Sequence, residues 1–194
     1  MESVAKKSAS HLPIIIEFKI SSPTYPIKRK CHWLRRFSYL PDVSNMTPSM
    51  AIDRMRKFCA YQERAHSEVR TKLIKLGVYG DDLEEVMSHL IDEDYLNEER
   101  YARSYVRGKF RINKWGKFKI RMHLNQKRVS EHCIDKGMEE IDEEEYINMI
   151  DSLLERKLSE NPDFKEKQKA RDSLMRKGFE PALVSSRIAE LRGR

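Results

Sequence analysis

The chain has 194 residues, with 38 Lys and Arg against 31 Asp and Glu, a formal net charge of +7. Charged residues make up 36% of it, where an ordinary domain has about 25%. No apolar run approaches the roughly 18 residues of a membrane span, and three cysteines without close spacing do not form a disulfide framework. Seven Gly and seven Pro among many Leu, Ile, Glu, Lys and Arg favour helices over an all-β fold. The sequence therefore predicts a helical, cytoplasmic protein that is not a membrane protein.

The first segment, residues 1–46, differs from the rest. It holds eight Lys and Arg against three Asp and Glu, and prolines interrupt it without any helical or strand period. We predict a basic, poorly ordered tail. A functional basic arm and a natural start at Met46 or Met50 are open alternatives.

An internal repeat of about fifty residues follows this segment. Six apolar positions with helical spacing recur in three copies, and a break separates the fourth residue of each copy from the second. The copies are Val69, Leu73, Val78, Leu83, Met87 and Leu90; Ile120, Leu124, Val129, Ile134, Met138 and Ile141; and Ala170, Leu174, Phe179, Val184, Ile188 and Leu191. Gly77 and Gly178 stand where a helix end favours a left-handed residue, whereas the second copy has Arg128.

A longer helix is predicted before each copy, at about 48–63, 98–113 and 143–158. The unit is then three helices, and stacked units complete a core that one unit cannot bury. We predict an all-α fold of three tandem three-helix repeats in an elongated, curved array. The expected repeats are 47–96, 97–141 and 142–194, after the tail at 1–46.

Charge is strongly segregated inside the repeats. Residues 97–128 hold eleven Lys and Arg against two Glu, whereas residues 129–145 hold eight acids and one Lys. On a helical wheel, the cations of 97–114 other than Lys109 fall within an arc of about 80°. We call this row and its continuation into the next helix the basic ridge: Arg100, Arg103, Arg107, Arg111, Lys114, Lys117 and Arg121. Lys109 lies on the apolar side of the wheel, where we expect its chain to snorkel.

Two interpretations of the ridge are possible. A solvated helix face normally mixes Glu with Lys at i, i+4 spacing, but no acid occurs between residues 100 and 130. The repulsion between like charges favours a binding role, for phosphate or carboxylate. Trp115 and two tyrosines of the same segment can stack on bases, but their positions favour a core role.

Catalytic signals are absent from the sequence. There is no phosphate-binding loop, no GxGxxG, no nucleophile motif and no CxxC spacing. Glu85 and His89 lie four apart on one predicted helix, but a metal site needs partners that the sequence does not supply. We predict no enzyme, no cofactor and no metal; a metal-dependent helical enzyme using these two residues is the remaining alternative.

Several motifs resemble a known family. They are IDEDYLNEERYA at 91–102, NKWGKFKIRMHL at 113–124, RKGF at 176–179, and AHSEV at 65–69 before Leu76-Gly77. With these motifs the chain resembles the RecX family, regulators of the RecA recombinase, over about 48–192. It departs from the family at Arg128, where a Gly is usual, and in its long first segment.

The resemblance implies a monomer that binds in the groove of the RecA–DNA filament and contacts RecA, DNA or both. It also implies inhibition of strand exchange, ATP hydrolysis and coprotease activity in DNA repair and the SOS response. The basic ridge is the expected contact surface, with its split between RecA and DNA left open. The rival hypothesis is a stand-alone helical DNA-binding protein that uses the same ridge.

Overall fold

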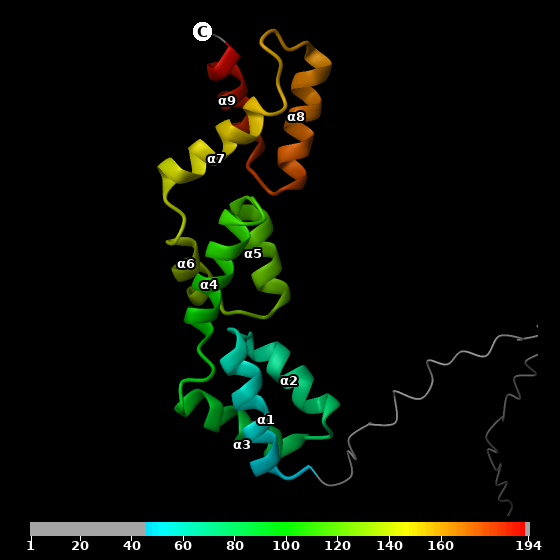
Figure 1. Ribbon diagram of the computed structural model, residues 1–194, viewed down its shortest axis with the longest axis vertical. Coiled ribbons are helices and arrows are strands. Elements are labelled where there is room, and N and C mark those ends of the chain that lie inside the picture. Colours follow the sequence, from blue (N-terminus) through cyan, green and yellow to red (C-terminus); the bar gives the residue numbers. More distant parts are fainter. Residues whose placement is uncertain (1–45, 193–194) are drawn as a thin grey trace, which may run out of the picture. The chain divides into compact units, whose positions relative to one another are not determined.

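The computed structural model describes residues 46–192, and this part of the chain folds into helices without a strand (Figure 1). The helices are α1 (Pro48–Tyr61), α2 (His66–Lys75), α3 (Gly80–Asp92), α4 (Glu98–Arg111), α5 (Lys117–Gln126), α6 (Glu131–Met138), α7 (Glu143–Glu155), α8 (Phe164–Arg176) and α9 (Pro181–Arg192). The all-α prediction is confirmed for these residues, and each expected repeat range contains three helices. The predicted tail lies outside the described residues, apart from Met46.

The three long helices begin where the sequence predicts and end two or three residues earlier. Each has a side-chain cap, since the side chains of Thr47, Asn97 and Asp142 accept hydrogen bonds from backbone N–H groups three residues on, at 3.4, 3.0 and 3.0 Å. Such caps satisfy N–H groups that have no partner inside the helix. Local sequence therefore sets the start of each unit.

The turn after each middle helix has the same backbone in all three units. Gly77 and Gly178 have φ of 82° and 89°, as predicted, and Arg128 has φ of 59°. The N–H two residues past each helix bonds back in the same way, as from Val129 to the carbonyl of Leu124 at 3.2 Å and from Phe179 to that of Leu174 at 3.2 Å. The Arg at this position therefore keeps the turn, although a left-handed residue with a side chain costs roughly 1 kcal/mol.

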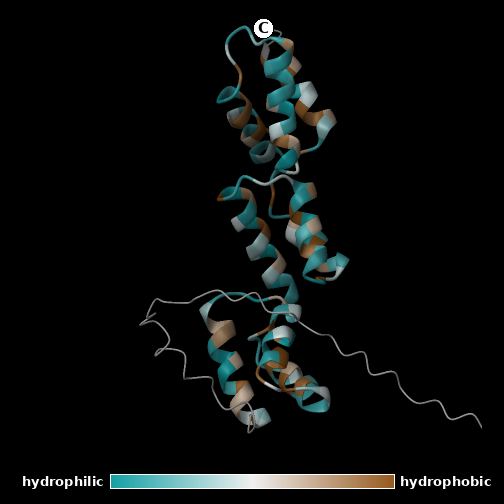
Figure 2. Cartoon of the chain, turned by 90° about the vertical axis from the view of Figure 1, so that its right-hand side faces the viewer, coloured by the Kyte–Doolittle hydropathy of each residue, from teal (hydrophilic) through white to brown (hydrophobic). Residues whose placement is uncertain are grey.

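The recurring apolar positions form the core. All of them are buried except Met138 and Leu191, which are partly buried against it. The first unit has its own cluster, whereas one continuous cluster runs through the second and third units and includes Ala65. Figure 2 shows hydrophobic and hydrophilic residues alternating along the helices, as one-sided burial requires.

Successive units meet through one repeated joint. The N–H of Gly116 donates to the carbonyl of Lys177 at 2.8 Å, and the N–H of Phe118 donates to the carbonyl of Gly178 at 3.2 Å. In the preceding joint, the hydroxyl of Ser67 donates to the carbonyl of Lys127 at 2.6 Å. The turn after a middle helix thus caps the start of the middle helix one unit earlier, which satisfies N–H groups at that start.

Candidate functional site

The ridge begins on α4, whose two faces have opposite characters. Tyr101, Ala102, Val106 and Phe110 are buried, and the arginines of the ridge lie on the other side of the helix. α6 packs closely on α4, because Gly137 lies so near Ala102 that a Cβ on the glycine would be 3.1 Å from the backbone of Ala102. This approach brings the acidic residues that follow α6 beside the arginines.

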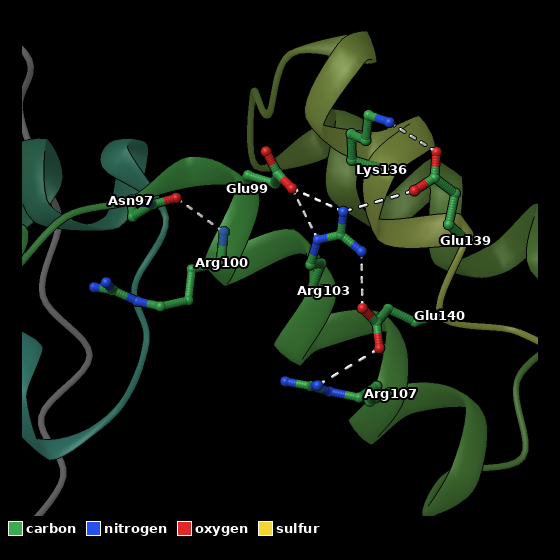
Figure 3. A network of polar contacts seen from close by, with 8 residues as sticks. All are labelled: Asn97, Glu99, Arg100, Arg103, Arg107, Lys136, Glu139 and Glu140. Atoms are coloured by element: carbon green, nitrogen blue, oxygen red, sulfur yellow. Dashed lines mark hydrogen bonds and ion pairs between the residues drawn. The ribbon is translucent and has the colours of Figure 1, made fainter.

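Arg103 lies at the centre of a network of ion pairs (Figure 3). Its guanidinium contacts Glu99 at 2.8 Å, Glu140 at 2.8 Å and Glu139 at 3.6 Å. Arg107 shares Glu140 at 3.5 Å. Lys136 and the nearby Arg103 hold the pKa of Glu139 below its usual value, and hydrogen bonds from the carboxylates raise the pKa of Arg103.

The other members of the ridge have carboxylate partners too, with one exception. Arg100 pairs with Glu63 at 2.7 Å and Asp94 at 2.6 Å, Arg111 with Glu145 at 3.1 Å, Lys117 with Glu143, and Arg121 with Glu131 and with Asp135 at 2.6 Å. Among residues 46–192, Lys114 has no ion pair. The seven cations are therefore surrounded by nine carboxylates.

The expectation of a ridge without acidic neighbours is wrong, although it is true of the segment 100–130 itself. The acids come from residues that precede the ridge and from the acidic block 131–145, which packing and chain direction place alongside it. Exposed pairs of this kind contribute about 0–1 kcal/mol each, but a network fixes side chains in place. The surface is consequently of mixed charge, which suits a protein partner with both signs better than a polyanion.

The ridge cations differ in how firmly they are held. The side chains of Arg100 and Arg103 are 39% and 30% exposed and have two or three partners each. Arg107 and Arg111 are 50% and 55% exposed with one partner each, and Lys114 follows them on the chain. The end of α4 thus carries the cations that are most free to contact another molecule.

The aromatic residues of this segment divide between core and surface. Tyr101 is buried, while Tyr105 and Trp115 are partly buried against the core. The ammonium group of Lys109 lies 5.2 Å from the ring centre of Tyr105 and 5.1 Å from that of Trp115, and that of Lys119 lies 4.5 Å from Trp115. Sequence reasoning treated Lys109 as a misfit, whereas the structure places it on an aromatic surface that the turn after α4 creates.

The other candidate sites of the sequence are not assembled. Glu85 and His89 are exposed on α3, and within residues 46–192 no three His, Cys, Asp or Glu side chains gather to hold a metal ion. Cys59 is buried, which raises the pKa of its thiol to about 11, and Cys31 lies outside the described residues. No helix in the described part of the chain is long and apolar enough to span a membrane.

Taken together, the helices define an all-α protein built from tandem three-helix repeats, whose outer face carries paired charges. The second three-helix domain of RecX matches residues 97–138, and the third matches residues 143–186. The chain belongs to the RecX family.

Relatives agree with this assignment. The regulatory protein RecX of Bacillus cytotoxicus is 32% identical over 138 residues, 70% of this chain and 51% of the relative, and that of Limosilactobacillus reuteri is 30% identical over 132 residues, 66% and 50%. The chain thus spans about half the length of the curated relatives it matches. The crystal structure of RecX from Lactobacillus salivarius is 25% identical, with a TM-score of 0.69, over 76% of this chain and 97% of that one.

Proposed function

We propose that this chain is a non-catalytic regulator that binds a RecA–DNA filament and lowers the ATPase, strand-exchange and coprotease activities of RecA. Its relatives are named regulatory proteins, and RecX-like proteins act on RecA, as the resemblance of the motifs implies. The proposal includes action in the cytoplasm as a monomer, in DNA repair and the SOS response.

The mixed charge of the ridge is the observation that carries this proposal. A polyanion such as DNA favours uncompensated cations, but the ridge cations face nine carboxylates. A protein surface offers both signs, so existing pairs can exchange partners across an interface at little net cost. We therefore assign the ridge to RecA rather than to DNA, and a stand-alone DNA-binding function through this ridge is the less favoured alternative.

The contact is expected at the end of α4. Arg107 has one long pair, at 3.5 Å, and Lys114 has none among the described residues, so they lose little on changing partner. Arg100 and Arg103 instead hold the network together. Lys117 and Arg121 continue the same surface onto α5 and are proposed to flank the contact.

Reversing the charge of Arg107 and Lys114 tests this proposal. The double variant Arg107→Glu/Lys114→Glu should weaken inhibition of the RecA ATPase on single-stranded DNA by at least about tenfold, because two contacts of about 1 kcal/mol become repulsive. The half-inhibitory concentration is measured, and circular dichroism checks that helicity is unchanged.

The matched control is Arg54→Glu/Lys57→Glu on α1, which makes the same charge change at two exposed residues. Neither residue has an ion pair among residues 46–192. The control should inhibit like the wild type. Equal losses in the two double variants would show that only net charge matters, and full inhibition by the ridge variant would refute a ridge contact.

A further inference from the structure

A second charged surface lies on the other side of α4 from the ridge. Around the helix axis, Lys109 is about 160° from the centre of the arginine row. We call Lys109, Trp115, Lys119 and His123 the Trp115 face. The proposed RecA contact does not use it.

The two lysines of this face rest on an aromatic ring instead of on carboxylates. Both ammonium groups lie over Trp115, at 5.1 and 4.5 Å from its centre, and the ring of His123 is 4.7 Å from it. Among residues 46–192, neither Lys109 nor Lys119 has an ion pair. An aromatic ring holds an ammonium group without neutralising its charge, so this face keeps the positive charge that the ridge has lost.

The surroundings of His123 give independent evidence for a positive potential here. Its pKa is lowered, first by burial and then by the charges of Lys119, Lys109 and Lys127. Lys127 is paired with Glu68 at 2.6 Å, so it adds less than the two unpaired lysines. At neutral pH the imidazole is uncharged and can donate or accept a hydrogen bond.

The next unit extends the positive charge. The ammonium group of Lys119 lies 3.4 Å from the backbone carbonyl of Arg176, and Gly178 packs against the side chain of Lys119. Arg176 and Lys177 therefore follow directly on the chain beside this face. Neither has an ion pair among the described residues 46–192.

We propose that the Trp115 face binds the phosphate chain of a single-stranded nucleic acid. Lys109 and Lys119 contact successive phosphates, and Trp115 holds their chains in place before binding, which reduces the entropy lost on contact. The exposed parts of Trp115 and Tyr105 lie next to these lysines and offer a stacking surface for an unpaired base. An acidic protein segment would match the lysines but not the aromatic surface.

This inference goes beyond the proposed function and does not depend on it. The ridge would contact RecA while the Trp115 face contacts a strand, so one helix would carry a protein contact and a nucleic-acid contact on opposite sides. A test without RecA therefore separates the two proposals.

The fluorescence of Trp115 provides a local measurement. The chain has two tryptophans, so Trp33→Phe in the full chain leaves Trp115 as the only one. Titration with a thymidine oligonucleotide of about 15 nucleotides, within the range that small single-strand sites cover, should change its emission in a saturable way.

Variants separate the two faces. Lys109→Gln/Lys119→Gln in the Trp33→Phe background should weaken binding about tenfold and lower the slope of log affinity against log salt by about 2, one for each lost phosphate contact. Arg107→Gln/Arg111→Gln removes the same charge from the ridge and should change the affinity less than about twofold. Circular dichroism verifies that each variant is folded.

Three results would overturn the inference. They are no binding of the oligonucleotide, binding without a change in Trp115 emission, and equal losses for the two double variants. Polyglutamate of similar charge should compete poorly; competition as strong as that of the oligonucleotide would assign the face to acidic protein instead. None of these results bears on RecA inhibition by the ridge.

Discussion

Gly116→Ala is expected to lower the free energy of unfolding by about 3 kcal/mol. A Cβ at this position would lie 2.2 Å from the carbonyl oxygen of Gly178 and 2.4 Å from the backbone N of Phe179. Both neighbours are backbone atoms, so the joint must separate to relieve the overlap. Overpacking of this kind costs about 1–3 kcal/mol, and the hydrogen bonds from Gly116 and Phe118 are weakened with it.

Gly108→Ala is the matched control in a urea titration. Gly108 lies inside α4, and a Cβ there would have nothing within 4 Å. Alanine is the better helix former, so this variant should gain about 0.5–1 kcal/mol. Opposite signs for the two Gly-to-Ala changes would support the close joint, and a neutral Gly116→Ala would refute it.

Tyr146→Phe is expected to cost about 1–3 kcal/mol although it keeps the ring. The ring of Tyr146 is 1% exposed and lies between Phe110 and Phe179, with centres 5.9 and 5.4 Å away. Its hydroxyl donates to Glu180 at 2.7 Å and accepts from the N–H of Lys117 at 3.2 Å. Removing it leaves a partly buried carboxylate and a helix N–H without this partner.

The control for this variant is Tyr105→Phe. Tyr105 is partly buried as well, but within residues 46–192 its hydroxyl makes no hydrogen bond. Its loss should change the free energy of unfolding by less than about 0.5 kcal/mol. Equal effects of the two Tyr-to-Phe changes in urea denaturation would mean that the Tyr146 hydroxyl does not connect the units. Burial and Glu180 both raise the pKa of Tyr146, so it remains a donor at neutral pH.

Both variants act on the same connection between units. Three successive N–H groups at the start of α5, on Gly116, Lys117 and Phe118, bond to Lys177, Tyr146 and Gly178. The motifs at 113–124 and 176–179, which carry much of the family resemblance, therefore fit each other. Their glycines are explained by backbone contact as well as by turn geometry.

The helices and turns could be predicted because their determinants are local. The i, i+4 spacing of apolar residues set the buried faces, and caps such as Asn97 and Asp142 set the helix starts. Arg128 was the one uncertain turn. It takes the left-handed conformation without glycine because the hydrogen bond from Val129 closes the turn as in the other two copies.

The charge environment of the ridge could not be predicted in the same way. A helical wheel shows only neighbours on one helix, where Arg103 has no acid after it in the segment. Its partners Glu139 and Glu140 reach it because Gly137 permits close packing of α6 on α4. The adjacent blocks of opposite charge were the available signal, and they indicated contact with each other as much as contact with a partner.

The Trp115 face was missed for a related reason. Lys109 is on the apolar side of α4, and only the turn at Lys114, with φ of 56°, brings Trp115 back beside it. No periodic pattern encodes this return of the chain. Tertiary structure thus exchanged the expected roles of the two sides, since the ridge is neutralised and the apolar side carries unpaired cations.

The central claim is that the chain acts on the RecA filament and not on free DNA. The most direct test titrates the full chain into RecA ATPase reactions on single-stranded DNA, beside titrations of the same DNA without RecA, at two salt concentrations. We predict half-inhibition at a concentration at least about tenfold below that of half-saturation of free DNA, with a much weaker salt dependence than DNA binding shows. Equal concentrations for the two effects, falling together with salt, would contradict the proposal.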